Sequence, residues 1–497
     1  MLTLDVSKGS GPMFYKPILI NFWLQAPRWV RLLTIFAAGG LAGLGQAPFD
    51  IPIFMLFGLG LGIWAAGQPS TISYFGNGWA LGFGYFAVAL AWIMQPFLVD
   101  WQATGWMAPL ALTAMAGGLA VFWGAAFAIV KGRKPLLICV ALFTSELTRT
   151  YLFTGFPWAL IGYVWIDTPL YQLSAFIGPH GITLLTIVMA YWLANSRLPY
   201  KIALMVLAAI MQLSPDIEIT EPKNGAAVVR LIHPNVAQTD KWDPDRMEGI
   251  YQRHLEMTDT GAIVNLIVWP ETSVYLPIPL AQREIAAVAH GAYVIVGYQS
   301  TSVNNQNFNT LGIISPMGDL EVEYHKSRLV PFGEYLPFAG LAALFGVQRG
   351  GFSSGDGPST IYLPGIGNIQ PLICYEGIFP QFVGRTDIRP DLLVLITNDA
   401  WFGQGQGPAQ HFAQARARAI ELGLPMVRVA NRGVSTVIDG NGAYGANLQV
   451  EDIGFIDLNI PASLSPTFYS RYPWLLTFFM TLFLLGSAFL KCNKREY

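Results

Sequence analysis

Long apolar runs separated by short polar connections fill most of the chain before residue 215, and one more run lies near its end. A helix needs about 17 to 25 residues to span roughly 30 Å of hydrocarbon. On this criterion the chain is predicted to contain about eight transmembrane helices. They lie near residues 29–47, 51–67, 77–98, 107–130, 135–153, 174–194, 200–214 and 473–490.

The fifth of these runs carries the charged residues Glu146 and Arg149, and the seventh is the shortest. Charges inside a span usually face the interior of a bundle or mark function. We interpret this pair as a brace near the membrane surface.

The pattern changes between residues 216 and 472, where short β-rich runs alternate with amphipathic stretches. AAVVRLIHP, AYVIVGYQS and LLVLITND are typical of strands, whereas LAQREIAAVAH and AQHFAQARARAIEL are typical of helices. Such a mixture predicts a layered α/β domain with helices covering the sheets. The chain therefore divides into a polytopic α-helical membrane bundle of about seven spans (1–215), a globular domain (216–472), and a C-terminal transmembrane helix with a tail (473–497).

Composition supports this division and excludes some partners. The chain is 53% hydrophobic and 12% charged, with a mean hydropathy of +0.43, whereas a soluble domain carries about 25% charged residues. A net charge of −2 provides no basic field, so no nucleic acid partner is predicted. The histidines show no paired metal-ligand spacing and no phosphate-binding loop is present, so neither a metal nor a cofactor is expected.

The positive residues predict an orientation. Cytoplasmic loops retain Lys and Arg during insertion, and with eight spans the four basic clusters fall on one side of the membrane. Both termini are then cytoplasmic, and residues 216–472 lie outside. The clusters are Lys8, Lys16, Arg28 and Arg31; Lys131, Arg133 and Lys134; Arg197 and Lys201; and Lys491, Lys494 and Arg495.

Candidate chemistry lies where three predicted strands end. In PLICYEGIFP an apolar strand stops at Cys374, where backbone amides could receive an oxyanion and a following helix N-terminus would favour the thiolate. NLIVWPE ends at Glu271, and YHKSRLVPFGEYLPF places Lys326 and Glu334 just after a third strand. Alone, each is more often a buried thiol or a solvated charge; together they can converge at one edge of a sheet. Cys139 and Cys492 are distant from these segments, and no disulfide framework is expected.

The segments WPE, HKSRLVPFGE and CYEG resemble the Glu, Lys, Cys signature of the nitrilase superfamily. ELTRTYLFTGFPWALIGY, PNVAQTDKW, TNDAWFG and PAQHFAQARARAIE are similar to its membrane-bound branch, the apolipoprotein N-acyltransferases. This resemblance covers nearly the whole chain. It implies an αββα sandwich for the globular domain, which would lie on the periplasmic side of a bacterial cell inner membrane.

The resemblance also implies roles for particular residues. Glu271 matches the general base, Lys326 the essential lysine and Cys374 the nucleophile. Trp242 matches a substrate-binding tryptophan. Three further residues match supporting positions around the site: Glu334, Tyr375 and Glu376.

Other segments near this site carry open alternatives. Glu334 is expected to orient Lys326 or Glu271 by a hydrogen bond. Trp401 and Phe402 line either a lipid cleft or the core, and Asn431 and Arg432 are expected to make structural hydrogen bonds. The apolar stretch FAGLAALFGVQRGGF, residues 338–352, is either an arm that admits lipid from the interface or an ordinary core helix.

The function implied by the resemblance is acyl transfer through a thioester on Cys374. The acyl donor would be a phospholipid, typically phosphatidylethanolamine, and the acceptor the N-terminal amine of the S-diacylglyceryl-cysteine of an apolipoprotein. One alternative is a membrane-tethered nitrilase-type amidase that acts on a small amide, for which a single span would suffice. The other is a polytopic transporter or receptor whose outer domain only binds a ligand.

Overall fold

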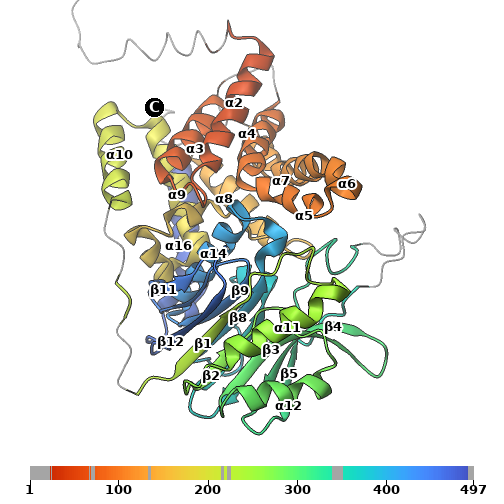
Figure 1. The fold of residues 1–497 in the computed structure, drawn as a ribbon. Coiled ribbons are helices and arrows are strands. Elements are labelled where there is room, and N and C mark those ends of the chain that lie inside the picture. Colours follow the sequence, from red (N-terminus) through yellow and green to blue (C-terminus); the bar gives the residue numbers. More distant parts are fainter. Residues whose placement is uncertain are drawn as a thin grey trace, which may run out of the picture.

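A bundle of helices and a pair of stacked sheets form the two ends of the molecule (Figure 1). The structure is a computed structural model, and it describes residues 23, 25–66, 68, 73–131, 136–213, 218–220, 225–337 and 351–490. The chain builds most of the bundle first, then the sheets, and returns to the bundle with its last helix.

Each of the predicted apolar runs contains a helix of the bundle. Short helical turns connect several of these helices, among them η1 (Ala91–Met94), α5 (Gln95–Leu98), α6 (Trp101–Thr104), η2 (Gly105–Met107), η3 (Ile161–Trp165) and η4 (Pro169–Leu173). The main helices are α2 (Arg28–Gly43), α3 (Pro52–Ala66), α4 (Tyr74–Ala89), α7 (Ala108–Val130), α8 (Leu137–Tyr151), α9 (Ser174–Asn195), α10 (Leu198–Gln212) and α16 (Leu475–Leu490).

The lengths of these helices support membrane insertion but not the full count of spans. Two helical stretches of the described chain, Trp101–Val130 and Pro169–Asn195, are long and apolar enough to cross a membrane. Helix α4 and the segment Ala91–Leu98 would form a third span, bent by 65°. The other apolar helices are shorter, and 16 residues rise only about 24 Å. The eight-span count therefore stays a prediction.

The outer surface of the bundle is apolar. Ile129 on α7 is 76% exposed and Phe483 on α16 is 74% exposed. Inside, α2 and α4 touch through their backbones, since a Cβ on Gly84 would lie 1.9 Å from the Phe36 carbonyl oxygen. Small residues inward and large apolar residues outward are the arrangement that lipid favours.

Two six-stranded sheets form the α/β domain. In each sheet three central strands are parallel, β1, β2 and β3 in one and β7, β8 and β9 in the other, and the remaining pairs are antiparallel. The first sheet has the order β12 (Gly454–Asn459), β1 (Val228–His233), β2 (Leu266–Val268), β3 (Tyr293–Thr301), β4 (Asn307–Ile314) and β5 (Leu320–His325). The second has the order β11 (Tyr444–Leu448), β10 (Ser435–Ile438), β9 (Met426–Asn431), β8 (Leu392–Asn398), β7 (Gly367–Ile373) and β6 (Ile361–Leu363).

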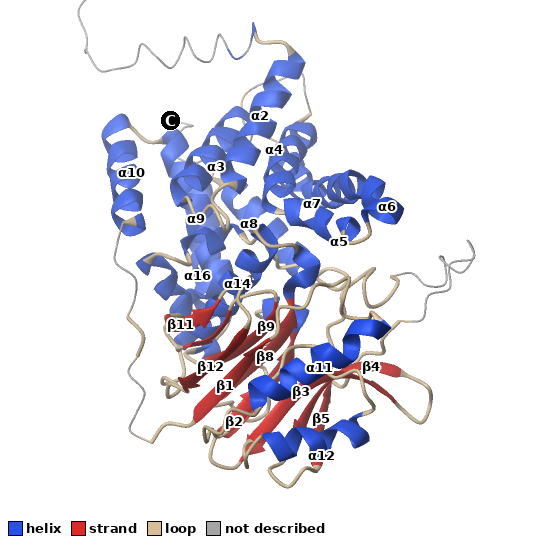
Figure 2. Ribbon diagram, viewed as in Figure 1, coloured by secondary structure: helices blue, strands red, loops and turns tan. Residues whose placement is uncertain are grey.

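The sheets pack face to face, and helices cover both outer faces (Figure 2). Between the sheets, apolar side chains such as Leu231 and Val268 meet Val394 and Val429. Helices α11 (Pro244–Thr258) and α12 (Ile278–Val288) cover the first sheet. Helix α14 (Gln406–Leu422) and the bundle cover the second. The expected layered α/β fold is therefore confirmed.

Helix α14 joins the two parts of the molecule. Of its 17 residues, 14 are buried, and the apolar cluster around it runs without a break from the second sheet into the bundle. The Gln410 amide donates to the carbonyls of Ala47 and Ala89, at 2.9 Å each, and accepts from the Trp158 indole at 2.7 Å. The sequence predicts an amphipathic helix here, whereas both faces of α14 are covered because the bundle supplies a second partner.

The pair predicted to act as a brace in the fifth apolar run makes an ion pair. Glu146 and Arg149 are buried, and their closest atoms lie 2.6 Å apart. The Arg149 guanidinium also donates to the carbonyls of Phe156, Trp158 and Ala159. The pair thus holds the loop that follows α8 against the bundle.

Candidate active site

Cys374 occupies a sharp turn at the end of β7. Its backbone has φ = 49°, a left-handed conformation that is unfavourable for a residue with a Cβ and that concentrates at functional sites. The residue is 6% exposed. The element that follows is the five-residue 3₁₀ turn η5 (Cys374–Ile378) rather than a long helix. A macrodipole strong enough to favour the thiolate is therefore not available from it.

Two carboxylates hold one ammonium group beside this turn. Lys326, which follows β5, donates from Nζ to Glu334 Oε1 at 2.8 Å and to Glu271 Oε1 at 3.3 Å. The Lys326 side chain is 1% exposed, that of Glu271 8% and that of Glu334 14%. The orienting contact predicted for Glu334 is confirmed, and it is made to Lys326.

The charges of this cluster act on one another and on the thiol. Burial raises the pKa of Cys374, the Glu271 carboxylate raises it further, and the Lys326 ammonium opposes them without reversing the shift. Burial would raise the pKa of Glu271, but the ammonium groups of Lys326 and Lys241 hold it below its ordinary value. Burial alone would lower the pKa of Lys326, but the carboxylates of Glu271 and Glu334 keep it well above the usual range.

The resting state that follows is a neutral thiol next to a carboxylate and an ammonium group. The sequence predicts that a following helix N-terminus favours the thiolate, but a five-residue 3₁₀ turn follows instead and the pKa of the thiol is raised. The strand end is buried between two sheets, and the nearest carboxylate is held in its charged form. Attack by the sulfur thus needs a base that removes the proton during the reaction.

Glu376 links the nucleophile turn to the lysine segment. It is fully buried, and its Oε1 accepts from the Ser327 backbone amide at 2.8 Å and from the Tyr324 hydroxyl at 2.9 Å. Its Oε2 accepts from the Ile373 amide at 2.8 Å. One carboxylate therefore fixes residues on both sides of Cys374 and Lys326.

Tyr375 turns away from this cluster toward the bundle. Its hydroxyl donates to the Gly155 carbonyl at 3.4 Å, and its ring lies edge-on to Phe379 with centroids 4.9 Å apart. Its side chain therefore anchors the nucleophile turn to the loop after α8.

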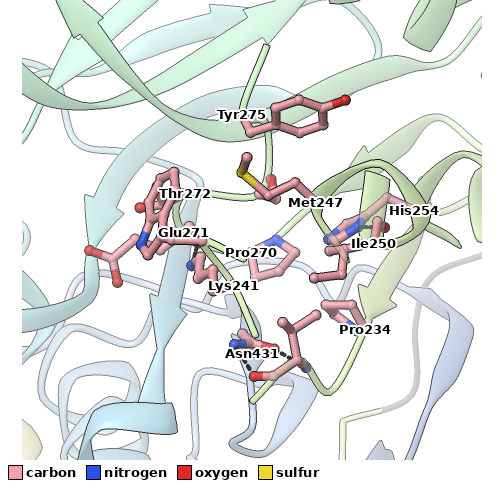
Figure 3. Close-up of a pocket in the computed structure, with 13 residues that line it drawn as sticks. Pro234, Lys241, Met247, Ile250, His254, Pro270, Glu271, Thr272, Tyr275 and Asn431 are labelled. Atoms are coloured by element: carbon pink, nitrogen blue, oxygen red, sulfur yellow. Dashed lines mark hydrogen bonds between the residues drawn. The ribbon is translucent and has the colours of Figure 1, made fainter. Parts of the chain in front are cut away.

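A pocket that Glu271 helps to line opens beside this cluster of charges (Figure 3). It has a volume of about 380 Å³ including its open mouth. Met247 and Tyr275 lie on one side and Asn431 on the other. Among the described residues, Glu271 lines this pocket but Lys326 and Cys374 do not. Its further lining residues are Pro234, Val236, Lys241, Trp242, Ile250, His254, Pro270, Thr272 and Ser273.

Lys241 and Trp242 belong to the loop at the mouth of this pocket. The Lys241 ammonium donates to the Glu271 backbone carbonyl at 2.9 Å, and burial lowers its pKa to about 8. Trp242, the next residue, is 46% exposed. A half-buried lysine thus anchors an exposed tryptophan beside Glu271.

Comparison with known proteins identifies the family. Residues 38–211 match the apolipoprotein N-acyltransferase N-terminal domain, and residues 226–463 match the carbon-nitrogen hydrolase family. An apolipoprotein N-acyltransferase from Rhizobium leguminosarum bv. trifolii is 34% identical over 480 residues, which are 86% of this chain and 90% of that protein. One from Brucella melitensis biotype 1 is 31% identical over 510 residues, 93% of this chain and 95% of that protein. This chain belongs to the apolipoprotein N-acyltransferase family.

A solved structure also resembles part of the chain. It is a carbon-nitrogen hydrolase superfamily protein from Xanthomonas campestris, 22% identical, which covers 51% of this chain and 97% of its own, with a TM-score of 0.36. The family assignment rests on the full-length relatives and does not depend on this likeness.

Two asparagines of this candidate site were not identified from the sequence. The Asn309 amide, on β4, donates to Glu271 Oε1 at 2.7 Å and to Glu334 Oε1 at 3.1 Å. The Asn398 backbone amide, at the end of β8, donates to Glu271 Oε2 at 2.9 Å. Asn398 belongs to TNDAWFG, but it contacts Glu271 through its backbone amide, so its side chain gave no signal for this contact. For Asn309 the usable signal was an asparagine inside an apolar strand, since a buried side-chain amide needs partners.

The remaining predicted residues lie around this cluster. Trp401, in η6 (Asp399–Phe402), is 43% exposed, whereas Phe402 packs edge-on against Trp92 of the bundle with centroids 4.9 Å apart. Asn431 makes the predicted structural hydrogen bonds, to the Val236 backbone and to Asn398. Arg432 donates to Asn235 at 2.8 Å, which is likewise structural.

The apolar stretch predicted at 338–352 falls almost wholly outside the described residues. Only Gly351 and Phe352 at its end are described. The alternatives for this stretch, a lipid-admitting arm or a core helix, therefore stay a prediction.

Proposed function

We propose that this protein transfers an acyl chain from a phospholipid to the N-terminal amine of an S-diacylglyceryl-cysteine on an apolipoprotein. One observation carries the proposal: a buried carboxylate, ammonium and thiol meet in a domain that shares one apolar core with a membrane bundle. Membership of the acyltransferase family supports it. Both substrates are held in the bilayer by their acyl chains, each buried methylene contributing about 0.8 kcal/mol, and a bundle can bring them to the site.

The first half of the reaction forms a thioester. Glu271 takes the proton from the Cys374 thiol while the sulfur attacks the ester carbonyl of the phospholipid. The negative charge that develops on the carbonyl oxygen is stabilised by Lys326 and by the backbone amide of the nucleophile turn. The ester C–O bond then breaks, and Glu271 returns its proton to the departing lysophospholipid. The raised pKa of the thiol makes this base necessary.

The second half consumes the thioester. The amine of the diacylglyceryl-cysteine attacks the acyl carbon, and Glu271 receives the proton that the amine loses. The C–S bond breaks, the sulfur recovers a proton from Glu271, and the acyl chain leaves as an amide on the apolipoprotein. No group other than the two substrates and this triad is consumed.

The supporting residues keep this triad in place. Glu334 fixes the Lys326 ammonium, Glu376 ties the nucleophile turn to the lysine segment, and Tyr375 anchors that turn to the bundle. The indoles of Trp242 and Trp401 are 46% and 43% exposed, and we assign both to substrate contact.

The finer details of donor and location are part of the same proposal. The donor is phosphatidylethanolamine, and the protein is a multi-pass protein of the bacterial inner membrane with its α/β domain in the periplasm. The basic clusters and the apolar outer surface of the bundle support this orientation. Reporter fusions at residue 215 and at the C-terminus should report opposite compartments. The same compartment for both would overturn the eight-span topology.

The test of the function is labelling of the enzyme by one substrate alone. Purified protein mixed with acyl-labelled phosphatidylethanolamine should form one label per chain on Cys374 and release lysophospholipid, and neutral hydroxylamine should remove the label. Cys374→Ala should show none, and Cys374→Ser almost none, because Glu271 is a weak base for an alcohol whose pKa lies far above that of a thiol.

Cys139→Ala is the matched control, since Cys139 is also a buried unbridged cysteine but lies in α8. It should label like the unmodified protein. Label that persists in Cys374→Ala would refute the mechanism. Hydrolysis of small amides without lysophospholipid release would instead favour the tethered amidase.

A further inference from the structure

A second set of buried charges lies behind the nucleophile turn, and the reaction described above does not use it. Asp399, His411 and Arg428 are each at most 1% exposed. Asp399 Oδ2 accepts from Arg428 at 2.6 Å, and Asp399 Oδ1 lies 2.9 Å from His411 Nδ1. Burial alone would raise the pKa of Asp399, but Arg428 and His411 hold it below the ordinary range.

His411 connects this set to the nucleophile. Its Nε2 lies 3.3 Å from the backbone carbonyl oxygen of Cys374. A carbonyl oxygen can only accept, so Nε2 carries a hydrogen and donates it. Nδ1 lies 2.9 Å from the Asp399 carboxylate and 3.3 Å from the Arg428 guanidinium, which together fix the plane of the ring.

The surroundings of the ring hold it in place. Trp158 stacks on the ring of His411 with centroids 5.7 Å apart and an interplanar angle of 23°. Gln410, the preceding residue of α14, bonds the same Trp158 and two carbonyls of the bundle. The bundle therefore sets the position of the ring that faces Cys374.

The carbonyl that His411 contacts belongs to the peptide unit whose N–H is that of Tyr375. A hydrogen bond to the oxygen of a peptide polarises its N–H, and chains of such bonds strengthen one another by perhaps 10–30% per bond. That N–H is the backbone donor in the proposed reaction. The same bond restrains the left-handed backbone of Cys374.

We infer that His411, held by Asp399 and Arg428, is a positioning residue that orients and polarises the Tyr375 amide as an oxyanion donor. The inference rests on the proposed acyl transfer, because only attack on a carbonyl develops an oxyanion. It assigns a role in the reaction to a residue of α14, the helix that joins the sheets to the bundle.

The test compares two reactions of the same sulfur in the full-length protein in detergent. Acylation by phosphatidylethanolamine passes through an oxyanion, whereas alkylation by iodoacetamide is a displacement at a CH₂ group and does not. Both reactions use the same sulfur and leave Glu271 and Lys326 unaltered, so a variant that slows acylation without slowing alkylation has lost stabilisation of the oxyanion. His411→Leu should lower the ratio of acylation to alkylation by about tenfold, less than the 10²- to 10³-fold typical of deleting a donor outright.

Two other variants separate this role from a loss of folding. His411→Gln places an amide N–H near the position of Nε2 and should restore the ratio to within about threefold of the unmodified protein. His411→Asn reaches toward Asp399 but not toward Cys374, so its ratio should resemble that of His411→Leu. If His411→Leu does not fold, the Gln and Asn pair still gives the comparison.

The matched control is His233→Leu. His233 is also fully buried in this domain, but its Nδ1 bonds the Ser435 hydroxyl rather than the nucleophile turn. The ratio of acylation to alkylation should not change in His233→Leu, even if this variant is less stable than the unmodified protein. An unchanged ratio in all His411 variants, or an equal fall in Gln and Leu, would overturn the inference. Absence of thioester in the unmodified protein would instead overturn the proposed function.

Discussion

The two sheets of the α/β domain contribute different chemistry to the site. The first sheet supplies the groups that handle charge, with Glu271 after β2 and Lys326 after β5, and its outer face is covered by α11 and α12. The second supplies the nucleophile Cys374 after β7, and its outer face packs on α14 and the bundle. The sulfur that carries the acyl chain is thus on the layer next to the membrane helices.

The sheets are tied to each other where these groups meet. The Asn398 amide of the second sheet bonds Glu271 of the first, at 2.9 Å. In the reverse direction, Glu376 after β7 bonds the Ser327 amide after β5, at 2.8 Å. The site is therefore not a property of either sheet. The second sheet aligns the base Glu271, and the first sheet holds the turn that carries Cys374.

Glu271→Gln removes the base of the first sheet and should have the largest effect on activity. Acyl transfer should fall about 10²- to 10⁴-fold, the usual contribution of a general base. Alkylation of Cys374 by iodoacetamide should become faster at pH 7, because the Glu271 carboxylate raises the pKa of the thiol and its removal lowers that pKa. The pH profile of alkylation should shift to lower pH. A parallel loss of both reactions would indicate a collapsed site.

Lys326→Ala should have the opposite effect on the thiol. Thioester formation should slow about 10²- to 10³-fold, because the oxyanion keeps a backbone donor only. Alkylation should also slow at pH 7, since the Lys326 ammonium lowers the pKa of Cys374 and its loss raises that pKa. The two variants should therefore move the alkylation profile in opposite directions. Shifts of the same sign would contradict the assigned charges.

Gln410→Leu tests how strongly α14 couples the second sheet to the bundle. The substitution leaves the Ala47 and Ala89 carbonyls and the Trp158 indole without their partner. It should lower the free energy of unfolding by about 1–3 kcal/mol, which thermal unfolding in detergent would measure. Gln252→Leu on the water-covered α11 is the control, because its bond to Glu248 is exposed. Equal losses in the two variants would mean that α14 does not couple the layers.

Arg246→Ala should have the smallest effect. Arg246 pairs with Asp240 at 2.6 Å, but its side chain is 58% exposed, and exposed ion pairs typically contribute about 0.2–1 kcal/mol. Acyl transfer and its dependence on phospholipid concentration should not change. A clear rise in the KM for phospholipid would show that the loop of Trp242 depends on this pair and that the first sheet also binds lipid.

Much of the fold and of the site was predictable because the signals are local. The apolar runs before residue 215 all contain helices, and the β-rich runs after residue 225 form the two sheets. Lys326 and Cys374 follow β5 and β7 directly, and Glu271 lies shortly after β2, so the strand ends indicated that the three could converge. They converge between two sheets, however, and not at one edge of a single sheet. The number of spans was less predictable, since α4 ends at Ala89 and the next helical segment is bent by 65° from it.

The sequence by itself determined which residues are apolar, where the strands end, and that a carboxylate, an ammonium and a thiol stand at those ends. Only the tertiary structure decided what surrounds them. It buried both faces of α14, brought Asn309 and Asn398 to Glu271, and raised the pKa of the thiol. The reason is physical: a periodic pattern depends on neighbours along the chain, whereas burial, hydrogen-bond partners and pKa depend on groups that are distant in sequence and adjacent only after folding.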